Sequence, residues 1–352
     1  MWLDGKRILV TGGTGSLGQA IVRRLLAGEM GKPGRVTVFS RDETKQHYMR
    51  LSYLERRCAT DDVVYRLGRE LLAFTIGDVR DYPTLLRAVR EADVIIHAAA
   101  LKQVPACEYS PFQAIQTNLL GTANLVRAVR ENDTPVQMVV GISTDKACKP
   151  VNAMGMTKAL MERMFVEANF NRTQTAFVCV RYGNVIASRG SVVPLFLDQI
   201  SRGGPVTITT AEMTRFLLSL DQAVDTVFAA FRGACRGEIY IPKAPSARVV
   251  DLAEVLIDGR EIPIVYVGIR PGEKTHEVMV SDEECYRTLE RDGFYVIQPL
   301  LPELAIERPK EPALIGEYSS SQVTLDHAAL RALLEPHLKH PMPAHINWAA
   351  VV

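Results

Sequence analysis

The chain has 352 residues, of which 47% are hydrophobic and 23% charged, and its formal net charge is +1. This is the composition of a globular protein, and a nearly neutral chain does not favour broad binding to nucleic acid or to an anionic membrane surface. No apolar run approaches the roughly 18 residues that a membrane span needs, so we expect neither a nucleic-acid nor a membrane partner.

The cysteines and the first residues favour a cytoplasmic protein. Six cysteines are scattered without a CxxC pair, which is typical of reduced thiols. The strand-like "KRILV" lies close to the N-terminus with no signal peptide before it. His337, His340 and His345 are close together near the C-terminus, where a solvated tail is the simpler interpretation, and we predict no metal site.

The first half of the chain alternates strand-like and helix-like segments. Short apolar, β-branched runs predict strands at 7–10, 35–39, 71–76, 93–99, 136–142 and 176–183. Apolar residues at helical spacing predict helices between them, notably at 17–26 and 111–130. Repeated β-α units with apolar strands imply a parallel sheet that is covered on both faces. We therefore predict an α/β fold with a doubly wound, Rossmann-type parallel sheet.

The pattern changes after Tyr182, where Gly and Pro punctuate 183–196 and 203–209 and shorter elements follow. We predict that residues 1–182 form the sheet domain, with a later return of chain near 213–235. Residues 183–352 then form a smaller C-terminal substrate-binding lobe and an arm, which includes a Pro-rich, charged stretch at 298–312. The lobe should lie over the carboxyl edge of the sheet, where open α/β sheets bind ligands.

A glycine-rich turn joins the first strand to the first helix. "VTGGTGSLG" places Gly12, Gly15 and Gly18 in a GxxGxxG pattern. Glycines let the backbone approach a pyrophosphate, and the helix N-terminus supplies N–H groups. A structural tight turn is the alternative, but the strand-turn-helix context favours a dinucleotide. The predicted cofactor-binding residues of this turn are Gly12, Thr14, Gly15, Ser16, Leu17 and Gly18.

The end of the second strand bears on the choice between NADP and NAD. An NAD site usually has an acid there for the ribose hydroxyls, whereas this chain places Ser40 and Arg41 before Asp42. Arg41 can pair with a 2′-phosphate, so we favour an NADP-binding domain. Asp42 keeps NAD open, and a solvated Arg41 is the alternative.

The third and fourth strands complete the predicted cofactor site. "GDVRD" brings an acid to the adenine, and the small side chains of "HAAA" allow close approach of the cofactor. His97 can equally be a packed core histidine. The cofactor-binding residues assigned here are Asp78, Val79, Ala98, Ala99, Ala100, Lys102 and Asn118.

The fifth strand leads into the predicted catalytic residues. "STDK" supplies Thr144, Asp145 and Lys146, and Lys158 shares a helix face with Met154. Lys158 can hold the nicotinamide ribose. An adjacent acid and base beside a hydride carrier exceed what ketone reduction needs, and they fit proton transfers at neighbouring carbons. The alternative for Asp145 and Lys146 is a surface ion pair worth ~0–1 kcal/mol.

Met154 stands where such a site normally carries a tyrosine. A thioether is at most a weak acceptor and takes no proton, yet oxidation of the substrate hydroxyl still requires its proton to leave. Asp145 is the nearest candidate base, directly or through a water held by Thr144. We interpret Met154 as part of an apolar wall near the nicotinamide.

Motifs along the chain carry a family resemblance as far as about Lys274. They are "TGGTGSLG", "FSRDETKQ", "HAAALKQVPACEYSPFQAIQTNLLGT", "STDKACKPVNAMGMTK", "RYGNVIASRGSVVPLF", "MTRFLLSLDQAV" and "RPGEK". Together they resemble extended short-chain dehydrogenase/reductases, and more narrowly the UDP-N-acetylglucosamine 4,6-dehydratases of surface-polysaccharide biosynthesis. The capsular, C5-inverting branch is similar in having Met at 154 and Cys at 107, whereas the flagellar branch has Tyr at 154.

The resemblance implies a mechanism and a set of residues. A hydride passes from C4 of the sugar to NADP and back to C6; Lys146 removes the C5 proton, Asp145 protonates the leaving C6 hydroxyl, Thr144 holds the C4 oxygen, and Cys107 assists at C5. It also implies a homo-oligomer, with a hexamer as one form. The implied substrate-binding residues are Lys102, Asn184, Arg189, Ser191, Arg215, Arg270 and Glu273, among which arginine forks suit a diphosphate.

Three alternatives remain open. A C5-retaining 4,6-dehydratase and a C4-epimerase of a nucleotide sugar would use the same frame, although an epimerase needs no C5 base. A non-catalytic NADP-binding protein is more remote, because Thr144, Asp145, Lys146 and Lys158 are all present.

Overall fold

A nine-stranded sheet forms the centre of the molecule, in the strand order β14-β15-β10-β6-β5-β4-β1-β2-β3. The computed structural model describes residues 1–54, 71–170, 174–186, 191–304 and 311–339. The strands of the sheet are β1 (Arg7–Thr11), β2 (Arg35–Ser40), β3 (Leu72–Ile76), β4 (Val94–His97), β5 (Met138–Thr144), β6 (Ala176–Tyr182), β10 (Ile239–Pro242), β14 (Thr288–Arg291) and β15 (Phe294–Ile297). β1 to β6 and β10 pair in parallel, which confirms the predicted doubly wound α/β fold.

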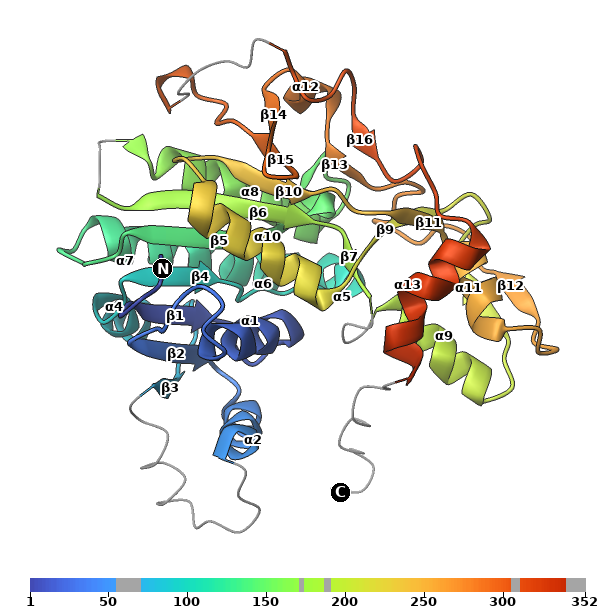
Figure 1. Cartoon of the computed structure of the whole chain (residues 1–352), viewed down its shortest axis with the longest axis horizontal. Coiled ribbons are helices and arrows are strands. Elements are labelled where there is room, and N and C mark those ends of the chain that lie inside the picture. The colour runs from blue at the N-terminus through green and yellow to red at the C-terminus, as the bar shows by residue number, and fades with distance from the viewer. Residues whose placement is uncertain (55–70, 171–173, 187–190, 305–310, 340–352) are drawn as a thin grey trace.

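Helices cover both faces of this sheet, because its central strands are apolar on both sides (Figure 1). Helices α1 and α10 pack against each other on one face, and α4, α7 and α8 pack in series on the other. Their bounds are α1 (Ser16–Leu26), α4 (Tyr82–Arg90), α7 (Gly121–Arg130), α8 (Ala153–Glu167) and α10 (Leu220–Gly233), and α2 (Glu43–Leu54) follows β2. The helical segment expected at 111–130 consists of α6 (Pro111–Ala114), a π-helical stretch η1 (Ile115–Leu120) and α7, preceded by α5 (Val104–Tyr109).

The sheet takes strands from beyond Tyr182, where the sequence suggested a division. β10 extends the parallel sheet next to β6, and β14 and β15 add an antiparallel hairpin at its edge. Asp292 and Gly293 form the two-residue turn of this hairpin, both with positive φ, as a type I′ turn requires. Helix α10 lies in the return expected near 213–235 and packs on β5, β6 and β10. The sheet domain therefore includes chain from both halves of the sequence.

A smaller lobe has its own apolar core, which includes Phe196, Leu217, Leu252, Leu256 and Leu330. Its elements are β7 (Asn184–Val185), α9 (Val192–Ser201), β8 (Val206–Ile208), β9 (Thr214–Leu218), β11 (Ser246–Arg248), α11 (Val249–Ile257), β12 (Ile264–Tyr266) and α13 (His327–Lys339). A further layer beside the sheet comprises β13 (Val278–Val280), α12 (Asp282–Cys285), β16 (Tyr318–Ser319) and the short turn η4 (Pro302–Leu304). Among the described residues, no helix is long and apolar enough to cross a membrane.

Candidate active site

A cleft of about 780 Å³ runs along the carboxyl ends of the strands and under the smaller lobe. The glycine-rich turn and the ends of β2, β3 and β4 line one end, and the start of α8, the loop after β6 and the segment 270–277 line the other. This is the edge at which open α/β sheets bind ligands. The fold thus brings most of the predicted cofactor, catalytic and substrate residues into one continuous space.

The glycine-rich turn packs closely against the residues after β4 and against the start of α1, because two of its glycines leave no room for a side chain. Gly12 has φ +68°, and a Cβ there would lie 2.7 Å from the backbone nitrogen of Ala99. A Cβ on Gly18 would lie 2.5 Å from the carbonyl oxygen of Gly12. All six residues predicted in this turn line the cleft, and the N-terminus of α1 opens onto it. The cradle therefore fits a dinucleotide pyrophosphate.

The ends of β2 and β3 gather charge near the expected adenosine ribose. Ser40 hydrogen-bonds Thr14 at 2.8 Å. Arg41 is half exposed, with its guanidinium 3.6 Å from the carboxylate of Asp78, and Asp42 is paired with Lys45. Burial acts to raise the pKa of Asp78, but hydrogen bonds from Arg80 outweigh it and the pKa is lowered. Lys45 lines the cleft with Arg41; the sequence reasoning missed it, although its helical spacing from Arg41 was a signal.

The loop after β4 places small residues and Lys102 in the cleft. Ala98, Ala99, Ala100 and Lys102 line it with Val79. Asn118 does not line the cleft: its amide binds both the N–H and the carbonyl of Leu101 and donates to Thr157 Oγ1 at 3.0 Å. Asn118 lies in the π-helical stretch η1, a local geometry often found at functional sites. It holds this loop in shape from beneath.

His97 is a core histidine, which was the alternative interpretation. Its ring is fully buried and hydrogen-bonds the hydroxyls of Thr11 at 2.9 Å and Thr122 at 3.1 Å. Burial, and then the charge of Lys158, lower the pKa of His97 to about 3. A ring that stays neutral and is paired on both nitrogens serves packing.

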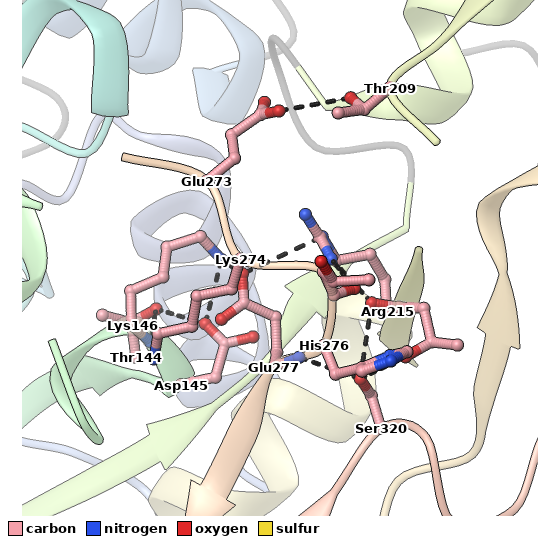
Figure 2. A network of polar contacts seen from close by, with 12 residues as sticks. Thr144, Asp145, Lys146, Thr209, Arg215, Glu273, Lys274, His276, Glu277 and Ser320 are labelled. Atoms are coloured by element: carbon pink, nitrogen blue, oxygen red, sulfur yellow. Dashed lines mark hydrogen bonds and ion pairs between the residues drawn. The ribbon is translucent and has the colours of Figure 1, made fainter. Parts of the chain in front are cut away.

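Three of the predicted catalytic residues form a polar cluster where β5 ends and the 3₁₀ turn η2 (Asp145–Ala147) begins (Figure 2). Thr144 Oγ1 donates to Asp145 Oδ1 at 2.8 Å, and Lys146 Nζ donates to the same oxygen at 3.0 Å. Thr144 and Lys146 line the cleft, whereas Asp145 is fully buried beneath them. Asp145 Oδ2 accepts no hydrogen bond among the described residues. Thr144 and Lys146 thus stand between this carboxyl group and the cleft.

The two lysines of the cluster differ in their electrostatics. Burial acts to lower the pKa of Lys146, but the carboxylates of Asp145 and Glu277 outweigh it, and the pKa is raised. Burial lowers the pKa of Lys158 to about 8 despite the nearby Cys179 and Glu162. Lys158 Nζ donates to the carbonyl of Ile142 at 2.7 Å, and its side chain lines the cleft. Lys146 is therefore held as an ammonium, while Lys158 loses its proton more readily because its pKa is about 8.

Met154 and Cys107 belong to a small apolar cluster with Ala114. Met154 lines the cleft, as expected for an apolar wall. Cys107 is fully buried, does not line the cleft, and its sulfur lies 3.8 Å from the carbonyl of Leu101. Burial, and then Glu108, raise the pKa of this thiol. In this arrangement the Cys107 thiol packs behind Met154 and does not face the substrate space.

The other end of the cleft is lined by five of the residues predicted to bind substrate, namely Asn184, Ser191, Arg215, Arg270 and Glu273. Arg189 lies outside the described residues. Arg215 donates to the carbonyls of Thr214 and Thr275, and Thr209 donates to Glu273 at 3.2 Å. Asn184 Oδ1 and Ser191 Oγ have no hydrogen-bond partner among the described residues. These two oxygen atoms can therefore form hydrogen bonds with a polar ligand at this end.

The sequence reasoning missed Glu277. Its carboxylate lies 3.3 Å from Lys146 Nζ and 3.8 Å from Arg215 Nε, and it lines the cleft. A second acid four residues after Glu273 in "GEKTHE" was the only signal in the sequence.

A separate group, Asp251, Glu254 and His327, has ligand atoms within 4.8 Å of one another. Asp251 is already paired with Arg248 at 2.5 Å, and none of the three lines the cleft.

Comparisons with known proteins identify a family. Residues 8–299 match a family model described as "Polysaccharide biosynthesis protein". A protein named UDP-glucose 4-epimerase from Rickettsia bellii (strain OSU 85-389) is 41% identical over 331 residues, or 91% of this chain and 92% of that protein. An uncharacterized membrane protein of Methanocaldococcus jannaschii is 44% identical over 305 residues, or 84% of this chain and 86% of that protein.

Solved structures of other proteins have the same fold as this chain. Pen from Bacillus thuringiensis has a TM-score of 0.84 at 34% identity and matches 96% of this chain and 99% of its own. DesIV, a dTDP-glucose 4,6-dehydratase from Streptomyces venezuelae, has a TM-score of 0.65 at 22% identity and matches 76% of this chain and 86% of its own; at that identity it shows the shared fold. The named relatives and neighbours thus include nucleotide-sugar epimerases and dehydratases. On the family model and the Rickettsia relative, the chain belongs to the polysaccharide biosynthesis protein family.

Proposed function

We propose that the protein is a UDP-N-acetylglucosamine 4,6-dehydratase that inverts C5 and forms a 4-keto-6-deoxy sugar nucleotide for surface polysaccharide. The observation that carries this proposal is the cluster of Asp145, Lys146 and Glu277 at the catalytic end of the cleft. Hydride transfer alone needs no such cluster, whereas removal of water across two carbons needs both an acid and a base. The choice of UDP-N-acetylglucosamine as the substrate rests on the motifs that resemble this dehydratase family.

A bound nicotinamide would accept the C4 hydride and return it to C6. The glycine-rich turn and Ala98–Ala100 would hold that cofactor. Arg41 and Lys45 at the ribose end favour NADP, since both are cations in the cleft, although NAD remains compatible with Asp42. The cofactor is restored in each cycle, so no net oxidation of NADPH is expected.

Because Asp145 is buried, Thr144 would relay protons between this carboxyl group and the substrate. The hydroxyl of Thr144 lies in the cleft and donates to Asp145 at 2.8 Å. It can accept the proton of the substrate O4 while it passes its own proton to Asp145. The carboxyl group loaded in this way later returns the proton through Thr144 as the C6 hydroxyl leaves. Lys146 removes the C5 proton, which the 4-ketone has made acidic.

The test is incubation of the purified protein with UDP-N-acetylglucosamine and NADP, followed by mass spectrometry and NMR. We expect a product lighter by one water, deuterium at C5 in heavy water, an inverted C5, and no net consumption of cofactor. Retention at C5 would instead indicate the retaining dehydratase. Stoichiometric turnover of the cofactor would contradict the proposal.

A second candidate is a C4-epimerase of a nucleotide sugar. The Rickettsia relatives, at 41% identity, carry the name UDP-glucose 4-epimerase. The same assay separates the two activities, because an epimerised product keeps the mass of its substrate. The absence of any change in the sugar would point to the non-catalytic alternative.

We also propose a homo-oligomer. Large apolar side chains are exposed on neighbouring elements at the α5–α8 side: Tyr109 is 91%, Phe112 62% and Leu160 50% exposed. Exposed apolar side chains gathered on adjoining elements commonly mark protein contact surfaces.

A further inference from the structure

Glu277 occupies a position that the proposed function leaves without a role. It immediately precedes β13, and its backbone is fixed to the turn after β16: the N–H of Glu277 donates to Ser320 Oγ at 3.0 Å, and the N–H of Ser320 donates to the carbonyl of Glu277 at 2.8 Å. Its side chain is almost fully buried and points at Lys146 (Figure 2). These two backbone hydrogen bonds and the burial of the side chain hold the Glu277 carboxylate in a fixed position beside Lys146.

The surroundings of Lys146 raise a chemical difficulty. A lysine that removes a carbon-bound proton must first be a neutral amine, but Lys146 Nζ lies 3.0 Å from Asp145 and 3.3 Å from Glu277. Opposite charges at such distances favour the ammonium form. The other charged groups that face Lys146, Arg215 and Lys274, are cations and act in the opposite direction, yet the pKa of Lys146 is still raised. Lys146 therefore needs a local group to take its proton.

We infer that Glu277 is the proton partner of Lys146 and makes it available as the C5 base. In this step an N–H bond of the Lys146 ammonium breaks and an O–H bond forms on Glu277, which leaves a neutral amine and a neutral acid. The amine lone pair then takes the C5 proton, and the electron pair of the C–H bond passes into the enolate of the 4-ketone. Protonation of C5 reverses these transfers. The inference rests on the proposed function, because it needs a C5 proton transfer.

Two features favour Glu277 over Asp145 for this task. Asp145 Oδ1 already accepts from Thr144 as well as from Lys146, and the proposed reaction uses it for the oxygens at C4 and C6. Glu277 lines the cleft, whereas Asp145 does not. Glu277 Oε1 lies 3.3 Å from Lys146 Nζ and can take the proton directly. Glu277 acts through Lys146 and is thus a positioning residue for proton transfer.

The first measurement needs no substrate. Competitive acetylation with acetic anhydride over a pH series, read by peptide mass spectrometry, reports the pKa of Lys146 in the whole protein. In Glu277→Gln this pKa should fall by about one unit or more, because a carboxylate in contact is lost. Glu317→Gln is the matched control: Glu317 pairs with the exposed Lys149 at 2.7 Å outside the cleft, and the titration of Lys146 should not change. An unchanged pKa in Glu277→Gln would overturn the inference.

The second measurement uses UDP-N-acetylglucosamine and NADP in heavy water. Glu277→Gln should still reduce the cofactor in a single turnover, because C4 oxidation uses Asp145. Deuterium entry at C5 should fall at least about 100-fold near neutral pH even though Lys146 is then more often neutral, because the buried amine has lost the group that takes up and returns its proton in each turnover. Glu277→Asp should restore part of the rate. Normal C5 exchange in Glu277→Gln would refute the inference.

The two measurements also separate the inference from the proposed function. If wild-type protein oxidises no UDP-N-acetylglucosamine, the proposed function fails, and the acetylation series still decides whether Glu277 controls the proton on Lys146. If wild type is active and Glu277→Gln loses cofactor reduction and C5 exchange together at every pH, the specific role in C5 proton transfer is refuted.

Discussion

At the scale of single residues, the proposed mechanism gives Asp145 the role that a tyrosine has in related sites. Its carboxyl group is buried behind Thr144, and Met154 supplies only apolar surface to the cleft. We expect Asp145→Asn to lose several decades of kcat and to fail at C4 oxidation, with no transient NADPH absorbance. Met154→Leu conserves volume and should keep kcat within about tenfold, or ~1.4 kcal/mol of barrier. Normal cofactor reduction by Asp145→Asn would show that the carboxyl group does not take this proton.

The proposed preference for NADP rests, at the same scale, on Arg41. Arg41 is half exposed at the end of β2, and its guanidinium lies 3.6 Å from the carboxylate of Asp78. A charge-assisted hydrogen bond to a 2′-phosphate is worth ~1.5–3 kcal/mol. Arg41→Ala should thus weaken NADP binding by about one to two decades and leave NAD binding nearly unchanged, as measured by calorimetry with both cofactors. Equal losses for the two would exclude a phosphate contact.

Lys158 gives the site a pH dependence. Burial lowers its pKa to about 8, so its charge is present below that pH and is lost as the pH rises through it. Affinity for the dinucleotide should therefore decrease above about pH 8 if Lys158 holds the ribose. Calorimetric titrations on either side of this pH measure the effect. Lys158→Arg, which stays charged, should bind with little pH dependence; a decline as steep as that of wild type would assign the dependence to another group.

At the scale of elements, a buried ion network joins the sheet to the layer that carries Glu277. Arg181 on β6 binds Glu162 on α8 at 2.6 Å and Glu284 on α12 at 2.7 Å, and it donates to the carbonyl of Met279 on β13 at 2.8 Å. The network connects four elements, joining α8 and β6 to β13 and α12, which come from a distant part of the sequence. It holds the strand after Glu277 against the end of β6.

Breaking this network should be costly. Arg181→Met takes the guanidinium away from the two buried carboxylates of Glu162 and Glu284, for which we expect a loss of ~3–5 kcal/mol in the free energy of unfolding. Arg130→Met removes an exposed pair with Glu167 and should cost less than ~1 kcal/mol. Denaturant unfolding of both variants makes the comparison. Similar small losses in the two variants would mean that the buried network contributes little.

The same network predicts a loss of stability in acid. Burial acts to raise the pKa of Glu284, but Arg181 outweighs it and lowers the pKa from 4.5 to about 2. A carboxyl group with a lowered folded-state pKa stabilises the fold above its unfolded value and loses that contribution as the pH falls through the folded value. The contribution of Glu284 should therefore decline between about pH 4.5 and pH 2. In Glu284→Gln this part of the pH dependence should be absent from unfolding curves.

At the scale of the whole molecule, the exposed apolar side chains of α5, α6 and α8 predict self-association. Replacing both Tyr109 and Phe112, which are 91% and 62% exposed, by Asp should lower the mass measured by light scattering, because charges would be placed in a contact surface. The double variant of Val323 and Ile315, exposed elsewhere, serves as control and should keep the wild-type mass. A monomeric wild-type protein would contradict the proposed homo-oligomer.

The sequence by itself determined the features that local chemistry controls. Apolar, β-branched runs predicted β1 to β6 because a strand buried on both faces needs them. The glycine-rich turn was readable because no side chain fits at Gly12 or Gly18. The position of Thr144, Lys146 and Lys158 in the cleft could be predicted because the carboxyl ends of parallel strands meet at one edge of the sheet. Each of these inferences depends on a few neighbouring residues.

Only the tertiary structure decided contacts between distant segments. It joined β14 and β15 to the sheet beyond Tyr182, buried Asp145 behind Thr144, and placed Cys107 behind Met154. It also brought Glu277, which immediately precedes β13, to Lys146 after β5. None of these contacts leaves a periodic pattern in the sequence. Burial and charge pairing depend on which elements pack together, and the packing of the two apolar cores decides that.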